Sequence, residues 1–403
     1  MQKKRIFIST YYMEIGGVER SLIGLLHSLD YKKVTVDLFL HRHTGEFMSL
    51  IPKEVNLLPE DKYYATYSRP VKQLFKEGFI KIGVSRALAA LRTKNEIKKK
   101  NLKENASSVT YSVLYTEPFL PSLEKYGNYD LAISFLMPHN IVLRKVKAKK
   151  KIGWIHTDYS TIYLNKEIEK PNWEPLDHIV SISKSVEKSF LSIFPELESK
   201  IIEIENILHP KIVKEQAKEK EVKPELQRNE DDAILFCSVG RISYAKNFDQ
   251  IPFVCQKLVE LGHNVKWYII GDGGSTEEVE KNIQSCGMEN HVFLLGKKAN
   301  PYPYMLACDF YLQLSRYEGK AVTVREAQIL GKKVIISDFP TAKSQLEDGV
   351  DGIIVPMENI AAAEAIDDFI RDKEKQNAIV QALKEGNYGN EEEVEKIYEL
   401  LDI

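Results

Sequence analysis

Long apolar runs are absent from this sequence, and cysteine and tryptophan are scarce. No stretch approaches the ~20 apolar residues that a helix needs to cross a bilayer, and the basic segment Met1 to Arg5 is followed by too short an apolar run for a signal peptide. The four cysteines show no C-x-x-C spacing and stand in apolar contexts, which favours reduced core thiols. We therefore expect a cytoplasmic protein, with peripheral contact at the inner face of a membrane left open.

An excess of one charge is also lacking, because 56 Lys and Arg residues face 58 Asp and Glu residues, a net charge of −2. This balance argues against bulk affinity for nucleic acid. The 403-residue chain is 43% hydrophobic and 28% charged, as in globular proteins, and its length favours two domains and excludes a disulfide mini-scaffold. The charges are unevenly divided, with 32 Lys and Arg against 24 Asp and Glu in residues 1–209. One half is basic and the other acidic.

Short β-rich runs alternate with helical patterns from residue 233 onward. Because these runs are almost continuously apolar, they predict a parallel sheet covered by helices on both faces, as in a Rossmann-like domain. The first half repeats the pattern less cleanly, which predicts a second domain of the same kind and an α/β fold of two Rossmann-like domains facing a cleft. The expected strands are 5–9, 34–40, 55–58, 131–135, 152–155, 178–182, 234–239, 265–270, 292–295, 310–314, 334–337 and 352–355.

The domain boundaries follow from composition. Residues 211–232 are highly charged with almost no apolar periodicity, which predicts a linker between domains 1–210 and 233–389. After a glycine-containing break, residues 390–403 form a separate amphipathic helix that can dock back on the N-terminal domain.

A basic helical insert is expected near residues 62–105, which carry twelve Lys or Arg against three Glu, with Phe, Ile and Leu dispersed among them. Lys145 to Lys151 add a second basic run. One interpretation is a solvated helical face. The other is a surface attracted to an anionic membrane, to which each engaged cation contributes about 1 kcal/mol.

Two cations stand on the loop after the strand that ends at Val239. This loop, Gly240 to Asn247, contains Arg241 and Lys246 and leads into a helix expected over residues 247–261. Backbone N–H groups, the positive end of a helix dipole and two cationic side chains together suit a diphosphate. A pair of cations on a solvated loop is the competing explanation.

Two glutamates follow the strand expected at 310–314. Glu318 lies on the loop and Glu326 in the first turn of the next helix, so both carboxylates can hold hydroxyls of one extended ligand. Glu326 has a second explanation, because Thr323 and Glu326 have the spacing of a capping box. Glu318 has no such alternative.

Taken together, these motifs resemble the donor-binding domain of retaining glycosyltransferases of family 4, which have the GT-B fold. The resemblance extends over nearly the whole chain, and the order of the motifs is more specific than any one of them. Its elements are 240–247, 318–327 and 331–334 in the second half, and 16–20, 153–158 and 181–185 in the first.

The resemblance implies that Arg241 and Lys246 bind the nucleotide diphosphate and that Glu326 binds the ribose hydroxyls. Glu318 is implied to be a catalytic residue that holds a hydroxyl of the donor sugar. Where many family members have Glu-Gly-Phe-Gly, this chain has Glu318-Gly-Lys-Ala. The backbone N–H groups can still bind the donor, but the added lysine leaves the sugar undefined. The residues concerned are Gly319, Lys320 and Ala321.

In the N-terminal domain, which the resemblance implies to bind the acceptor, His156 is the second catalytic candidate. It is expected close to the donor sugar, with Asp158 as its orienting partner. Gly16 and Gly17 are implied to let the donor phosphates approach the backbone, where a Cβ would collide. No Asp-x-Asp motif follows a strand, so no metal is required, and the cations and a helix dipole are expected to meet the diphosphate charge.

The sequence therefore predicts a retaining transferase of the hexosyl or N-acetylhexosaminyl type. The donor is a nucleotide-diphosphate sugar, a UDP-sugar before a GDP-sugar, and no other cofactor is expected. The acceptor is a hydroxyl of a glycan, soluble or lipid-linked, as in bacterial surface polysaccharide or glycoconjugate synthesis. Two alternatives stay open: a GT-B sugar epimerase, and a non-catalytic GT-B partner subunit that binds the acceptor. An intact set of Arg241, Lys246, Glu318 and Glu326 counts against the second.

Overall fold

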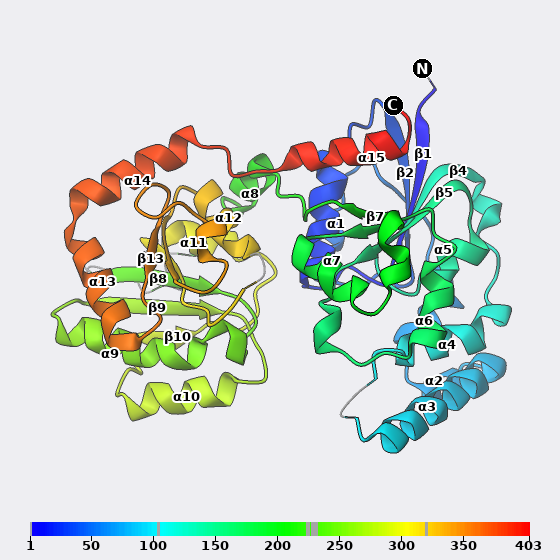
Figure 1. Cartoon of the computed structure of the whole chain (residues 1–403), viewed down its shortest axis with the longest axis horizontal. Helices are drawn as coiled ribbons and strands as arrows, with labels where there is room; N and C mark the ends of the chain where they lie inside the picture. Colours follow the sequence, from blue (N-terminus) through cyan, green and yellow to red (C-terminus); the bar gives the residue numbers. More distant parts are fainter. Residues whose placement is uncertain (1, 103–104, 223–225, 227–232, 319–320) are drawn as a thin grey trace. The chain divides into compact units, whose positions relative to one another are not determined.

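The computed structural model describes residues 2–102, 105–222, 226, 233–318 and 321–403. It divides into two compact units, Met1–Ile207 with Asn390–Ile403, and Leu208–Gly389 (Figure 1). Each unit is built on one parallel sheet, as predicted. The predicted donor contacts Gly319 and Lys320 lie outside the described residues.

The first unit has a seven-stranded parallel sheet in the order β3-β2-β1-β4-β5-β6-β7. The inner strand β1 is apolar on both sides and buried at Ile6, Phe7 and Ile8, because helices and loops cover both faces. The six strands predicted in this half are present, and β7 was not predicted. The strands are β1 Lys4–Thr10, β2 Val34–Leu40, β3 Asn56–Leu57, β4 Asn128–Ser134, β5 Lys147–Ile155, β6 His178–Ser181 and β7 Ile201–Glu203.

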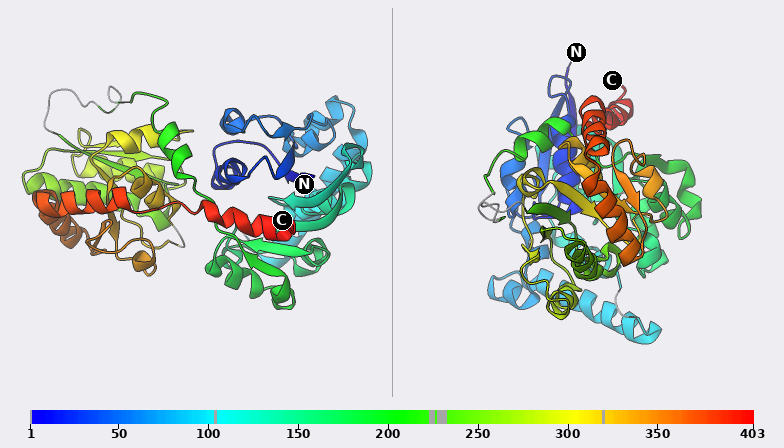
Figure 2. Two further views of the ribbon diagram at one scale, coloured as in Figure 1. Left: turned by 90° about the horizontal axis from the view of Figure 1, so that it is seen from above. Right: turned by 90° about the vertical axis from the view of Figure 1, so that its left-hand side faces the viewer.

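The described part of the basic segment, residues 62–102, forms helices inserted between β3 and β4. Figure 2 shows the long helix of this insert on the outside of the first unit. The C-terminal residues also belong to this unit, where the Tyr398 hydroxyl accepts a hydrogen bond from the Asp30 backbone N–H at 2.6 Å. The helices are α1 Gly17–Ser28, α2 Val71–Lys76, α3 Ile80–Lys100, α4 Ser108–Thr116, α5 Asn140–Lys145, α6 Lys166–Trp173, α7 Lys184–Leu191 and α15 Glu395–Leu400.

The second unit has a six-stranded parallel sheet in the order β10-β9-β8-β11-β12-β13. Alternate residues of β8 enter two separate cores, with Phe236 in one and Leu235 and Cys237 in the other, which shows that both faces are covered. All six predicted strands are present. They are β8 Ile234–Val239, β9 Val265–Ile270, β10 Val292–Leu294, β11 Phe310–Gln313, β12 Lys333–Ser337 and β13 Ile353–Val355.

The segment expected to be a linker is in part a helix of the second unit. Helix α8, Pro210–Gln216, begins with a proline in its first turn, and Val213 and Ala217 are buried at a spacing of four residues. Val222 joins the same core. The expected linker is therefore wrong over its first part, because a single small apolar side chain per turn was hidden among lysines and glutamates.

The other helices of the second unit cover its sheet. Among the described residues of both units, no helix has the length and the apolar stretch that crossing a membrane requires. The remaining helices are α9 Ile251–Glu260, α10 Thr276–Ser285, α11 Tyr302–Ala307, α12 Val322–Ile329, α13 Asn359–Arg371 and α14 Lys373–Glu385.

Candidate active site

An arginine joins the loops that follow β8 and β11. The Arg316 guanidinium donates to both carboxylate oxygens of Asp249, at 2.8 and 2.6 Å, and lies 4.1 Å over the ring of Tyr244. Its backbone N–H donates to the Ala245 carbonyl at 2.8 Å. Burial alone would raise the pKa of Asp249, but the hydrogen bonds from Arg316 and Gln250 and the guanidinium charge lower it. The loop that carries Arg241 and Lys246 is thus held against the loop that carries Glu318.

Lys246 and Glu318, predicted from separate motifs, form an ion pair. Lys246 Nζ lies 2.6 Å from Glu318 Oε1, and their side chains are only 20% and 10% exposed. The Ser315 hydroxyl donates to the same oxygen at 2.6 Å. An ammonium group has three N–H donors, so Lys246 can hold this carboxylate and still donate to an anionic ligand.

A buried glutamine connects Glu318 to helix α12. Gln313, fully buried at the end of β11, donates to Ser315 Oγ at 2.8 Å and accepts hydrogen bonds from Tyr311 at 2.8 Å and Thr323 at 3.2 Å. Burial raises the pKa of Tyr311, and the negative charges of Glu318 and Glu326 raise it further. Gln313 thus joins the Glu318 loop to the start of α12 by hydrogen bonds.

The capping-box explanation for Glu326 is wrong. Helix α12 has Ala321 at its N-cap without a side-chain cap, and the Thr323 hydroxyl bonds to Gln313 instead. Glu326 is only 4% exposed, and its Oε1 accepts a hydrogen bond from the Tyr302 hydroxyl at 2.6 Å. The Ala321 N–H donates to Gln345 Oε1 at 3.0 Å, and a donor contact through this N–H stays a prediction.

Arg241 differs from Lys246 in its surroundings. Its side chain is exposed, and no carboxylate among the described residues pairs with it. The helix that was expected to begin at Asn247 begins at Ile251, because Asn247 has a left-handed φ of 59° and a short 3-10 turn follows. The dipole of α9 therefore starts one turn farther from Lys246 than predicted.

A glycine-rich loop after β9 was missed by the sequence analysis. A Cβ at Gly271 would lie 1.8 Å from the Gly240 carbonyl oxygen, and one at Gly273 would lie 2.1 Å from that of Ile242. The loop can therefore pack directly on the Arg241 loop only without side chains. The Gly-Asp-Gly-Gly sequence directly after a predicted strand could have indicated this loop from the sequence.

His156 follows β5 in the first unit. Its ring lies 4.7 Å from that of Phe135, and its Nε2 is buried without a hydrogen-bond partner in the described chain. Burial lowers the pKa of His156 to about 3, so the imidazole is neutral at pH 7. Asp158 accepts hydrogen bonds from the N–H and the hydroxyl of Ser160, whereas His156 bonds to the Phe135 backbone. The predicted orienting role of Asp158 is therefore wrong.

The two glycines at the start of α1 have different surroundings. A Cβ at Gly16 would lie 2.2 Å from Glu19 Oε2, whereas one at Gly17 would meet nothing within 4 Å. The Glu19 carboxylate is the far end of a flexible side chain that can move aside, so this contact does not require glycine at position 16, and Gly17 leaves open space. A phosphate contact at either glycine stays a prediction. Within the described ranges, no group of three or more His, Cys, Asp or Glu side chains is arranged to hold a metal ion.

The family match to known proteins lies within the second unit. The family described as Glycosyl transferases group 1 matches residues 218–386. Among similar proteins, the alpha-D-kanosaminyltransferase of Streptomyces kanamyceticus is 26% identical over 147 residues, which are 36% of this chain and 38% of that protein. The poly(ribitol-phosphate) alpha-N-acetylglucosaminyltransferase of Staphylococcus aureus is 27% identical over 123 residues, 30% of this chain and 25% of that protein. The matches thus span well under half the length of these relatives.

Similarity to solved structures extends over both units. The Anabaena Alr3699/HepE structure in complex with UDP-glucose superposes with a TM-score of 0.65 and 17% identity, covering 99% of each chain. Two parallel α/β units with this match define the GT-B fold, which confirms the predicted fold class.

Proposed function

We propose that this protein is a retaining glycosyltransferase that moves a hexosyl or N-acetylhexosaminyl group from a UDP-sugar to a hydroxyl of a glycan acceptor. The observation that carries the proposal is the Lys246–Glu318 ion pair of 2.6 Å on loops joined by Arg316. Arg241 lies on the same loop as Lys246 and has no carboxylate partner in the part of the chain that the structure describes. The group 1 match and the transferase names of the relatives support it. The UDP-glucose in the Anabaena structure supports the choice of donor.

In the proposed reaction, two cations bind the diphosphate of the donor and two carboxylates bind its hydroxyl groups. Arg241 and Lys246 face the diphosphate, Glu326 accepts hydrogen bonds from ribose hydroxyls, and Glu318 accepts one from the donor sugar. The bond between C1 and the diphosphate oxygen breaks with its electron pair on the phosphate. The acceptor oxygen then bonds to C1 from the same face, and its proton passes to the departing phosphate. The cations stabilise charge that grows along this path.

The test is a screen of UDP- and GDP-sugars for thermal stabilisation of the purified protein. A ligand at 100 times its Kd stabilises the folded state by ~2.7 kcal/mol, which is a measurable rise in melting temperature. We expect a UDP-sugar to raise the melting temperature and UDP to compete with it. Absence of stabilisation by all nucleotide sugars at millimolar concentration would contradict the donor assignment.

Glu326→Gln is expected to weaken UDP binding about tenfold in the same assay. The amide keeps an oxygen that can accept from Tyr302 but loses the charge that strengthens hydrogen bonds from ribose, worth roughly 1.5 to 3 kcal/mol. Tyr302→Phe is the matched control, because it leaves the carboxylate in place and should cost less affinity. If Glu326→Gln changed the melting temperature but left the UDP affinity unchanged, the ribose role would be wrong.

The insert supports a second proposal, attachment to an anionic membrane surface. Four apolar side chains of α3 at positions 80, 84, 88 and 91 are 45 to 61% exposed and fall on one face of the helix. Lys81, Arg92, Lys98 and Lys99 are exposed alongside them. The one described acid of this helix, Glu96, is engaged by Tyr111 and Asn165. An apolar stripe with basic flanks and no free acid suits a leaflet of anionic lipid.

The second basic run, Lys145 to Lys151, offers fewer unpaired cations to a membrane than its composition predicted. Lys149 pairs with Asp130 at 2.7 Å, Lys150 with Asp402 at 3.2 Å, and Lys145 lies 3.7 Å from a Glu117 oxygen. These lysines lie on β5 or directly before it, where carboxylates of neighbouring elements meet them. We therefore place the membrane surface on α3 alone.

Co-sedimentation with vesicles tests this surface. We expect binding to anionic vesicles but not to neutral phosphatidylcholine vesicles, and we expect salt to weaken this binding. The double variant Leu88→Gln/Leu91→Gln should lower the affinity about tenfold or more, because ~25 cal/mol is lost per Å² of apolar contact. Lys149→Gln is the control and should bind like the wild type. Failure of the wild type to bind anionic vesicles at low ionic strength would contradict the proposal.

A further inference from the structure

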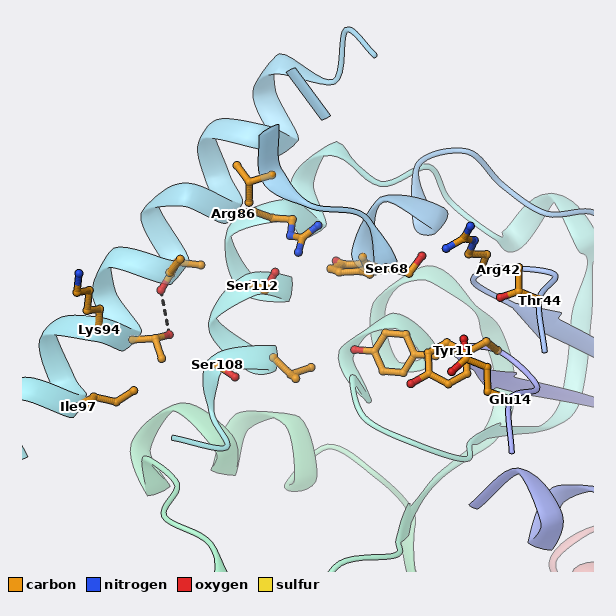
Figure 3. A pocket seen from close by; sticks show the side chains of 17 residues that line it. Tyr11, Glu14, Arg42, Thr44, Ser68, Arg86, Lys94, Ile97, Ser108 and Ser112 are labelled. Carbon is orange, nitrogen blue, oxygen red and sulfur yellow. Dashed lines mark hydrogen bonds between the residues drawn. The ribbon is translucent and has the colours of Figure 1, made fainter. Parts of the chain in front are cut away.

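A pocket of about 800 Å³ opens in the first unit, and none of the residues predicted for the donor lines it (Figure 3). Helix α3 of the insert and helix α4, which follows the insert, form one wall. The loops after β1 and β2 and the 3-10 helix Tyr64–Ser68 form the other. The pocket thus lies at the carboxyl ends of parallel strands, where α/β domains bind ligands.

Its charged lining is predominantly cationic. Arg42, Arg86 and Lys94 line the pocket, with Glu14 as the acidic lining residue. Figure 3 shows Arg42 and Arg86 on opposite sides, with Ser68 between them. No carboxylate of the described chain pairs with either guanidinium. Two unpaired arginines facing one space favour an anionic ligand.

Arg86 is the more constrained of the two. Its Nη1 donates to the carbonyl oxygens of Thr66 at 2.5 Å and Arg69 at 2.6 Å, which positions the side chain and leaves its other N–H groups available. Burial lowers the pKa of this guanidinium from its usual value, which shows that its charge is poorly solvated. A poorly solvated cation without a counter-ion gains most from an anion placed beside it.

The rest of the lining suits a sugar. The Tyr11 hydroxyl makes no hydrogen bond with the described residues, and burial raises the pKa of Tyr11, so it stays a donor at neutral pH. Tyr67 lies edge-on to Tyr11, with ring centroids 6.5 Å apart. Ser108 and Ser112 of α4 add two further hydroxyls. Aromatic faces with hydroxyl donors bind the apolar and polar sides of a sugar ring.

We infer that this pocket binds a phosphate-bearing sugar, with Arg42 and Arg86 on the phosphate and Tyr11 on a neighbouring oxygen. The further identification of this ligand as the glycan acceptor rests on the proposed function. A phosphate group offers several acceptor oxygens and up to two charges to donors on opposite sides, whereas one arginine satisfies a carboxylate in a single bidentate contact. The same phosphate chemistry can come from a free sugar phosphate or from the phosphate of a lipid carrier.

Titration calorimetry of the full chain with α-D-glucose 1-phosphate tests the pocket. Arg42→Gln and Arg86→Gln should each weaken binding about tenfold or more, and Tyr11→Phe several-fold. Lys149→Gln on β5 and Lys281→Gln on α10 of the other unit, neither of which lines the pocket, should bind like the wild type. Methyl α-D-glucoside, which lacks the phosphate, and D-glucuronate should bind at least about tenfold more weakly. Arg86 also bonds to the backbone, so Arg42→Gln gives the answer if Arg86→Gln fails to fold.

A second arm uses phosphatidylcholine vesicles with and without a polyprenyl phosphate. Binding that depends on Arg42 in either experiment supports a phosphate site in this pocket. Arg42-dependent binding in calorimetry identifies a free sugar phosphate as the ligand, and Arg42-dependent binding to the vesicles identifies the phosphate of a lipid carrier. Binding of the sugar phosphate that is unchanged in both arginine variants, or equal binding of glucuronate, would overturn the inference. The binding assays contain no donor sugar, so they test the pocket independently of the transferase activity. If binding depended on the arginines but the protein transferred no sugar, the proposed function would be contradicted and the pocket assignment would still hold.

Discussion

Replacing Arg241 with alanine is expected to reduce sugar transfer about 100-fold or more while leaving the melting temperature unchanged. The guanidinium is exposed and has no carboxylate partner in the described chain, so its removal breaks no internal ion pair. In the proposed reaction it faces negative charge that grows as the donor bond breaks, and losing such a contact costs several kcal/mol of transition-state stabilisation.

The matched control for this variant is Lys281→Ala, which removes an exposed cation from helix α10 of the same unit. It should keep wild-type transfer. If Arg241→Ala retained activity within about a factor of three of the wild type, the diphosphate contact would be disproved, since that factor is under 1 kcal/mol.

Changes at the Lys246–Glu318 pair should separate catalysis from stability. Glu318→Gln is expected to lower turnover about 100-fold with little change in melting temperature, because Ser315 can still bond to the amide oxygen and the freed ammonium is part-exposed. Lys246→Ala should lower transfer as strongly and also cost roughly 1 to 3 kcal/mol of stability, because it leaves the Glu318 carboxylate without its cation.

Steady-state kinetics and thermal unfolding of both variants check this difference. Glu347→Gln, on an exposed part of the second unit, is the control and should change neither quantity. Wild-type turnover in Glu318→Gln would remove this residue from the reaction, and an unchanged melting temperature in Lys246→Ala would show that the pair contributes nothing to folding.

The sheets were predictable because many of their strands are almost continuously apolar, as β8 and β9 show. Two elements were not. Strand β7 has three residues and ends in a glutamate, too short for any periodicity. Helix α8 buries two small apolar side chains among charged ones, so composition indicated a linker where the second unit has a helix.

In the candidate site, the sequence identified residues but not their partners. Glu326 has capping-box spacing, yet Thr323 bonds to Gln313 and Glu326 to Tyr302, because both partners come from elements distant in sequence. The bidentate contact of Arg316 with Asp249 joins residues 67 positions apart in sequence and carried no local signal. The pocket of Arg42 and Arg86 was missed for the same reason, since the topology brings together one loop and one inserted helix.

The anomeric configuration of the product decides whether this protein is a retaining glycosyltransferase. The purified protein is incubated with the UDP-sugar that stabilises it and with a glycan acceptor, and the product is examined by NMR while released UDP is measured. We expect one UDP released per glycosidic bond formed, with the configuration of the donor retained in the product. An inverted linkage, or a donor converted to its epimer without an acceptor, would contradict it.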